Sequence, residues 1–180
     1  VIVGSQDEFQ IIDRYFTRPT EDRDVLLGIG DDAAVLQING PVVITTDTFV
    51  EGVHFPDTLS GDAIGYRILA VNLSDLAAMG AKPLTYLMAV ALTKPANPNW
   101  LELFSNGLLN DQIRYGLGLS GGDTVATPGP LSISITMFGK IDEGKALKRT
   151  NAKVGDDIWV SGTVGDAAVA LKIRLGEIYL

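Results

Sequence analysis

The sequence predicts an α/β fold of the α+β type, in which a mixed sheet carries helices on one face. Two apolar runs, residues 42–44 and 84–92, are typical of buried strands. Residues 62–79 and 98–115 instead space their apolar side chains at helical intervals. Residues 131–141 alternate apolar and polar side chains, which predicts a strand with one buried face.

Composition limits the classes of function. The chain has 180 residues, of which 22 are acidic and 14 basic, so its net charge of -8 argues against nucleic-acid partners. It has no cysteine, which excludes disulfides, thiolate metal sites and a cysteine nucleophile. No segment approaches the roughly 20 apolar residues that span a bilayer, so no membrane partner is expected. We expect a cytoplasmic protein.

The N-terminal third predicts a helix followed by a hairpin-rich start to the sheet. Ser5 and Glu8 have the spacing of a capping box, which predicts a short helix. Strands are predicted at residues 25–29 and 33–38, on either side of an acidic turn. Residues 39–40, Asn-Gly, are a strong turn signal before the next strand.

Further along, Gly80 is a plausible C-cap for the helix over residues 62–79, and Asn97 is a natural N-cap for the second helix. A short strand is predicted at residues 117–119, with a flexible loop over 124–130.

Residues from about 150 onward predict the start of a second domain. A strand at residues 158–161 and a helix opening after 162–166 are expected there. One strand and one helix cannot bury their own apolar faces. We therefore divide the chain into a domain of residues 1–149 and the beginning of another over 150–180, most of which is expected to be absent from this chain.

Four acidic sites lie at the ends of predicted elements. Asp47 follows an apolar strand, where a carboxylate needs a cation or hydrogen-bond donors to offset its desolvation. Asp75 lies in the last turn of its helix, where its charge opposes the helix dipole. Asp123 follows two glycines that permit close approach to a ligand. Together with residues 31–32, these aspartates are hypothesised to converge on a divalent metal, since oxygen ligands suit magnesium.

Each site has a simpler alternative. Residues 31–32 and 121–123 could be ordinary turns, a common use of Asp and Gly. Asp75 and Asn72 could instead belong to a hydrogen-bond network in the core, in which each polar group has a partner. Residues 28–33 fit a G-x-G-x-x-A dinucleotide pattern, but a strand rather than a helix is predicted to follow, so we reject that interpretation.

Five segments form a specific pattern along the chain: GIGDDAAV (28–35), TTDTFVEGVHF (45–55), AVNLSDLAAMGAKP (70–83), GGDT (121–124) and KALKRTNAKVGDDIWVSGTVGDAA (145–168). Together they resemble the thiamine-monophosphate kinase family, within the aminoimidazole-ribonucleotide-synthetase superfamily. The resemblance implies an N-terminal ATP- and magnesium-binding domain whose sheet pairs with a second subunit in a homodimer, followed by a C-terminal α/β domain that is largely missing.

The resemblance also implies ligands for individual residues. His54 would face thiamine monophosphate, although a lone histidine is more often a packing or surface residue. Arg149 would contact ATP, although a basic run is usually a solvated surface. Gly122, Asp123 and Tyr115 would complete the ATP site. Several Mg²⁺ ions would be held by Asp32, Thr45, Thr46, Asp47, Asp75 and Asp123.

One departure from the family pattern concerns ATP. The family usually has GGDTTRGP, whereas this chain has GGDTVATPGP over residues 121–130, so any contact made by the family arginine is lost.

The implied reaction is phosphorylation of thiamine monophosphate to thiamine diphosphate, with direct in-line transfer of the ATP γ-phosphate. A phosphate monoester is already ionised near neutral pH, so neutralisation of charge matters more than a general base. Two alternatives remain. One is another enzyme of the superfamily, such as a purine-pathway synthetase, with a selenophosphate synthetase disfavoured by the lack of cysteine. The other is a non-catalytic module that binds magnesium-nucleotide or mediates dimerisation.

Overall fold

The computed structural model describes residues 7–17, 24–93 and 97–179. The chain divides into two compact units, Val1–Leu147 and Lys148–Leu180, which are described separately below. The division lies two residues before the boundary that the sequence predicts. None of the helices among the described residues is long and apolar enough to cross a membrane.

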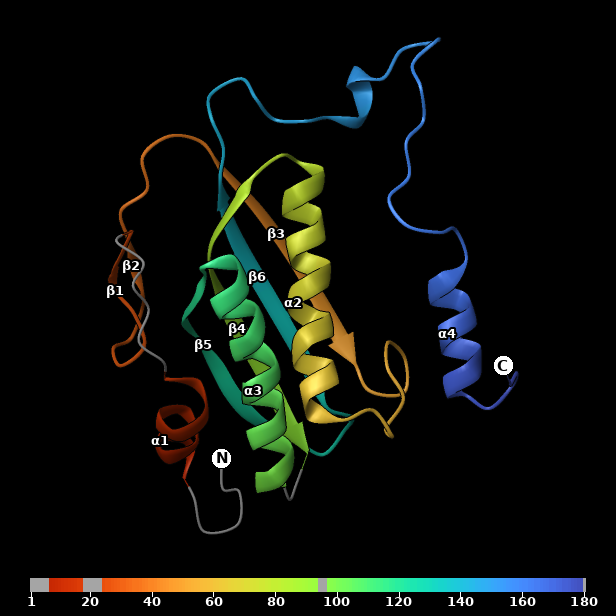
Figure 1. Cartoon of the computed structure of the whole chain (residues 1–180). Helices are drawn as coiled ribbons and strands as arrows, with labels where there is room; N and C mark the ends of the chain where they lie inside the picture. The colour runs from red at the N-terminus through yellow and green to blue at the C-terminus, as the bar shows by residue number, and fades with distance from the viewer. Residues whose placement is uncertain (1–6, 18–23, 94–96, 180) are drawn as a thin grey trace. The chain divides into compact units, whose positions relative to one another are not determined.

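The first unit is built on a four-stranded mixed sheet, as the sequence predicts (Figure 1). Its strand order is β3-β6-β4-β5, so β3 and β5 form the two edges. The β3–β6 and β6–β4 pairs are antiparallel, whereas β4 and β5 are parallel because a helix connects them. The strands are β3 (Val42–Val50), β4 (Lys82–Thr93), β5 (Gly118–Thr127) and β6 (Ser132–Lys140).

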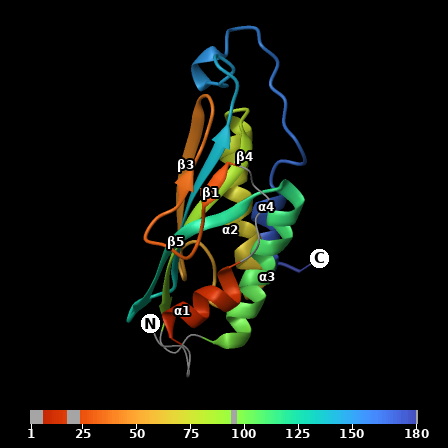
Figure 2. The same cartoon turned by 90° about the vertical axis from the view of Figure 1, so that its left-hand side faces the viewer.

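Two long helices, α2 (Gly61–Ala78) and α3 (Pro98–Tyr115), cover one face of the sheet (Figure 2). The predicted N-cap of α3 is confirmed, because the Asn97 side chain accepts a hydrogen bond from the Asn99 N–H. Gly116 ends the helix in the left-handed conformation, at φ 64°. Gly80 follows the end of α2 at φ 75°.

The two helices approach closely at three glycines, Gly61, Gly65 and Gly107. A Cβ on Gly65 would lie 2.6 Å from the Phe104 carbonyl oxygen, and one on Gly107 would lie 2.3 Å from that of Asp62. The helix backbones are therefore in direct contact, and no side chain fits between them there.

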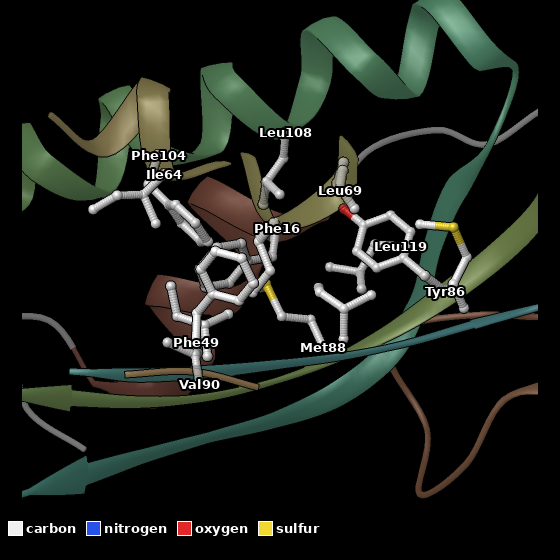
Figure 3. Packing of buried hydrophobic residues seen from close by; sticks show 14 of the residues in the cluster. Phe16, Phe49, Ile64, Leu69, Tyr86, Met88, Val90, Phe104, Leu108 and Leu119 are labelled. Atoms are coloured by element: carbon white, nitrogen blue, oxygen red, sulfur yellow. The ribbon is translucent and has the colours of Figure 1, made fainter. Parts of the chain in front are cut away.

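The core lies between these helices and the sheet (Figure 3). Tyr86, Met88 and Val90 point from β4 toward the helices, where Phe104 and Leu108 of α3 meet them. The alternation predicted for β6 is confirmed, since Leu131, Ile133, Ile135 and Met137 are all buried.

The N-terminal elements differ from the prediction in detail. The first helix, α1 (Glu8–Ile11), continues as the π-helical turn η1 (Ile12–Phe16), and its capping box joins Asp7 to Gln10. The predicted cap Ser5 lies outside the described residues. The strands β1 (Val25–Leu27) and β2 (Val35–Leu36) are shorter than expected and form their own two-stranded sheet rather than the start of the main one.

Three other predictions were wrong. Asp47 does not lie where β3 leaves the core, because the strand continues to Val50. The strand predicted at residues 117–119 is longer, and the first part of the loop predicted over 124–130 is also strand, because β5 pairs with β4 as far as Thr127. Residues 158–161 form no strand, since no neighbouring strand pairs with them among the residues described.

The second unit contains the 3₁₀ turn η2 (Arg149–Asn151) and the helix α4 (Asp166–Arg174), which begins where the sequence predicts. The described side chains of this unit are almost all exposed, including Ile158 and Trp159. The unit therefore has no hydrophobic core of its own among its described residues.

Candidate functional site

A cavity of about 750 Å³ lies beside the β5 edge of the sheet. Two glycine-rich segments, residues 28–34 and 119–124, form much of its wall. The side chains of Leu87 and Phe138 contribute apolar surface from the sheet. The cavity therefore combines backbone and carboxylate groups with an apolar floor, a common composition for a ligand site.

Small residues let the two segments approach each other. A Cβ on Gly28 would lie 3.9 Å from the Ser120 carbonyl oxygen, and one on Gly121 would lie 4.0 Å from the Ala34 Cβ. Gly122 is the most constrained, because at φ 154° its Cβ would lie 1.8 Å from the Met88 carbonyl oxygen. Only glycine fits this position without a shift of β4 or β5.

A β-bulge places these glycines. Tyr86 pairs with Leu119 but Leu87 pairs with Gly121, so Ser120 is the extra residue in β5. Ser120 is buried, and its hydroxyl forms a hydrogen bond with that of Thr85.

Two of the predicted site residues, Asp32 and Asp123, line this cavity together with Gly122. The Asp32 N–H donates to the Asp31 carboxylate at 2.8 Å, which fixes the acidic turn. A strand, β2, follows rather than a helix, so the rejection of a dinucleotide fingerprint is confirmed.

The other predicted carboxylates lie where α2 packs against β3. We call this line of contact the β3–α2 groove and define it by Thr45, Asp47 and Phe49 of β3 and Arg67, Val71 and Asp75 of α2. The Thr45 hydroxyl donates to the Asp75 carboxylate at 2.9 Å. Asp47 is the next residue on the same face of β3, because strand side chains alternate between faces. Asp75 thus has a hydrogen-bond donor that sequence reasoning did not find.

The two places are distinct. Asp47 and Asp123 lie on opposite edge strands, three strand spacings apart, or about 14 Å between backbones. They also face opposite ways, since Asp47 shares the helix-covered face with Thr45, whereas Asp123 pairs with exposed Ala89. No group of three or more carboxylate or histidine side chains placed to hold a metal occurs among the described residues.

The remaining predicted metal ligand, Thr46, faces away from α2. Its hydroxyl donates to the Ile135 carbonyl oxygen at 2.9 Å and contacts the Thr136 hydroxyl at 3.1 Å. Its neighbours Thr45 and Asp47 lie on the other face of β3.

His54 follows β3 in a tight turn and is exposed. Its Nδ1 accepts a hydrogen bond from the Val50 N–H at 3.1 Å, and its ring stacks on Phe49 with centroids 5.7 Å apart. Because Nδ1 is an acceptor, the neutral ring carries its proton on Nε2, where it can be donated to a ligand.

Two other residues that were predicted to contact ATP, Tyr115 and Arg149, belong to other elements of the chain. Tyr115 ends α3, is 43% exposed and has the Arg114 guanidinium over its ring at 5.3 Å. It is not among the residues that line the cavity. Arg149 opens η2 in the second unit, where it is exposed.

Sequence reasoning missed Arg67, Phe49 and the apolar wall of the cavity. Leu87 and Phe138 reach the cavity from two different strands. Only the strand register, which no local motif encodes, could have placed them.

The mixed sheet, the helices on one face and the glycine-lined cavity define an α/β ligand-binding domain. Residues 30–141 match the family described as "AIR synthase related protein, N-terminal domain". The chain belongs to this family.

The similarity to individual proteins points to a narrower group than the family match does. The chain is 48% identical over 170 residues to the thiamine-monophosphate kinase of Escherichia coli strain K12. The alignment covers 92% of this chain and 51% of that protein. It thus spans about half the length of the curated relatives it matches.

Solved structures agree with this similarity. Thiamine-monophosphate kinase from Stenotrophomonas maltophilia K279a matches with a TM-score of 0.80 and 48% identity, over 87% of this chain and 49% of that one. The structure described as "AaThiL complexed with AMPPCP and TMP" matches with a TM-score of 0.72 and 29% identity, over 77% and 44%.

Proposed function

We propose that this chain is the ATP- and magnesium-binding part of a thiamine-monophosphate kinase, which transfers the γ-phosphate of ATP to thiamine monophosphate. Similarity to enzymes of that name along almost the whole chain is the observation that carries the proposal. A relative described with AMPPCP and TMP supports a nucleotide and, reading TMP as thiamine monophosphate, this acceptor.

The two regions of the site suit the two substrates. We assign ATP to the cavity, where Gly122 and Asp123 lie, and thiamine monophosphate to the β3–α2 groove, where His54 lies at one end. Arg149 and Tyr115 are proposed to complete the ATP site. The domain boundary near residue 149 also remains part of the proposal.

Magnesium fits the residues present. Mg²⁺ is usually held by one or two carboxylates, several waters and the phosphates of the substrate rather than by an all-protein cage. Asp32 and Asp123 would hold it in the cavity, and Asp47 and Asp75 with Thr45 in the groove. Thr46 points to the face of the sheet that α2 and α3 do not cover, so it is proposed to bind magnesium only on that face. Bound magnesium would neutralise charge on the phosphates that must approach each other.

This chain's residues would position the reactants rather than form a covalent intermediate. The acceptor phosphate is itself the nucleophile, so no side chain has to remove a proton. The γ-phosphate then passes from the ADP oxygen to an oxygen of the acceptor phosphate, and ADP leaves. We therefore propose direct transfer without a phosphoenzyme.

A homodimer is also part of the proposal. The face of the sheet opposite α2 and α3 carries Ile44, which is 60% exposed. A second copy packed on this face would remove that apolar surface from water.

The full-length protein that carries this chain provides the direct test. With ATP, thiamine monophosphate and Mg²⁺ it should form thiamine diphosphate, and removal of Mg²⁺ by EDTA should stop the reaction. Unphosphorylated thiamine and purine-pathway substrates serve as controls. Product from a purine-pathway substrate alone, or a labelled phosphoprotein trapped during turnover, would contradict the proposal.

A second candidate is a magnesium-nucleotide-binding module without catalysis, since Asp32, Gly122 and Asp123 line one cavity. Magnesium-dependent ATP binding without turnover by residues 1–180 would support this role for the isolated chain, whereas turnover would exclude it.

A further inference from the structure

The cation at one end of the β3–α2 groove has no assigned role. Arg67 is exposed on α2, and its guanidinium lies 5.6 Å from the centroid of the Phe49 ring. Among the described residues, no carboxylate lies within ion-pair distance of it. The contact holds the guanidinium at a defined place while leaving its N–H groups available to a ligand.

His54 contacts the same ring. Its stacking on Phe49 and its bond from the Val50 N–H fix the imidazole, and its Nε2–H remains available. The turn that carries it is also held, because the His54 N–H donates to the Val50 carbonyl oxygen at 2.8 Å. Phe49 therefore positions two groups that bind anions, one from α2 and one from the turn after β3.

The groove has opposite charges at its two ends. On α2, Arg67, Val71 and Asp75 are four residues apart and lie along one side of the helix. They run beside β3, since Asp75 bonds to Thr45 and Arg67 lies over Phe49. Asp47 lies between these two contacts on β3, about 7 Å along the strand from Phe49.

We propose that Arg67 and the Nε2–H of His54 bind the phosphate of the acceptor, a phosphate monoester, and that Arg67 is thereby a specificity-determining residue. The inference rests on the proposed function. A guanidinium presents paired N–H donors that match two phosphate oxygens, and a neutral imidazole adds a third donor. The acceptor phosphate would lie between this pair and the Asp47 and Asp75 end of the groove.

Two substitutions in the full-length protein test the role. Arg67→Gln should raise KM for thiamine monophosphate about 10- to 100-fold, the usual effect of losing a hydrogen bond to a charged group. KM for ATP should stay within about twofold. Arg67→Lys, which keeps the charge but loses the paired donors, should have an intermediate effect.

Arg14 supplies a matched control. It is also exposed, and its guanidinium lies 5.2 Å from the centroid of the buried Tyr15 ring. Arg14→Gln removes the same kind of contact away from the groove and should leave both KM values unchanged. Equal changes in both KM values for Arg67→Gln, or a thermal destabilisation with no change in KM, would overturn the inference in favour of packing alone.

Direct binding separates this inference from the proposed function. If the wild-type protein makes no thiamine diphosphate, the proposed kinase activity fails, and calorimetry with thiamine monophosphate then decides the role of Arg67. Loss of affinity in Arg67→Gln but not in Arg14→Gln supports it, as does unchanged affinity for unphosphorylated thiamine. Equal affinity in all three proteins, or no binding to the wild type, overturns it.

Discussion

The cavity beside β5 and the β3–α2 groove both contain predicted site aspartates, but they are built differently. Backbone forms much of the cavity: glycines let two segments approach, and a bulge shifts the register of β5. Side chains form the groove, where a hydroxyl bonds to a carboxylate and a cation lies over a ring. The first arrangement provides space, and the second provides oriented charge.

In the proposed function the two regions would bind different reactants. A nucleotide needs volume and backbone donors, which glycine-rich turns supply. A small acceptor phosphate needs a few fixed charges, which adjacent elements supply. The predictions below test whether the two regions act separately.

The largest effect is expected at Gly122. Gly122→Ala would place a Cβ 1.8 Å from the Met88 carbonyl oxygen, so it should destabilise the fold by about 3 kcal/mol and weaken ATP binding. Urea unfolding and nucleotide titration measure the two effects. Gly40→Ala is the matched control, because Gly40 also has a positive φ, of 90°, but has open space around it. An equal loss in both variants would show that backbone strain, and not the close approach of β5 to β4, sets the effect.

The next largest effects are expected for two carboxylate variants, one of which should change kcat and the other ATP affinity. Asp75→Asn should lower kcat about 100-fold with little change in ATP affinity, whereas Asp123→Asn should weaken ATP about 10-fold. Steady-state kinetics and ATP titration separate them, with the exposed Asp142→Asn as the control. If both variants change the same constant by the same factor, the two regions form one cluster.

The smallest effect concerns Asp111, a carboxylate outside both regions. It is 2% exposed and one of its oxygens has no partner among the described residues. Burial raises the pKa of Asp111, and the positive charge of Arg114 partly offsets this. The ionised form is therefore disfavoured in the folded state, and stability from this group falls as pH rises through its raised pKa.

Replacing Asp111 with Asn removes that titration. The variant should gain about 1 kcal/mol relative to the wild type between pH 3 and pH 7, measured by urea unfolding at each pH. Asp142 is exposed, so Asp142→Asn serves as the control for loss of a surface carboxylate. A constant difference across the pH range would mean that Asp111 does not carry the predicted shift.

Local signals predicted much of the fold. Asn97 and Gly116 cap α3 as their residue types require, and the alternation of residues 131–141 gave the buried face of β6. The extent of β5 was not predictable, because Gly121 and Gly122 resemble a loop until β4 pairs with them. Pairing energy from a distant strand overrode the local preference for a turn.

The candidate site was predictable by residue type rather than by arrangement. The motifs identified Asp32, Asp47, Asp75 and Asp123, but their division between two edges depends on the strand order. Arg67 was not recognised as part of a site, because its contact with Phe49 depends on how α2 packs along β3.

The close glycine contacts between α2 and α3 mean that a substitution on one helix can displace the other. Adding one methyl group at Gly107 would press on the backbone of α2 at Asp62. Because α2 also carries Arg67 and Asp75, such a change should displace both side chains from their β3 neighbours. Variants that impair turnover should therefore occur on α3, at a position that no reactant touches.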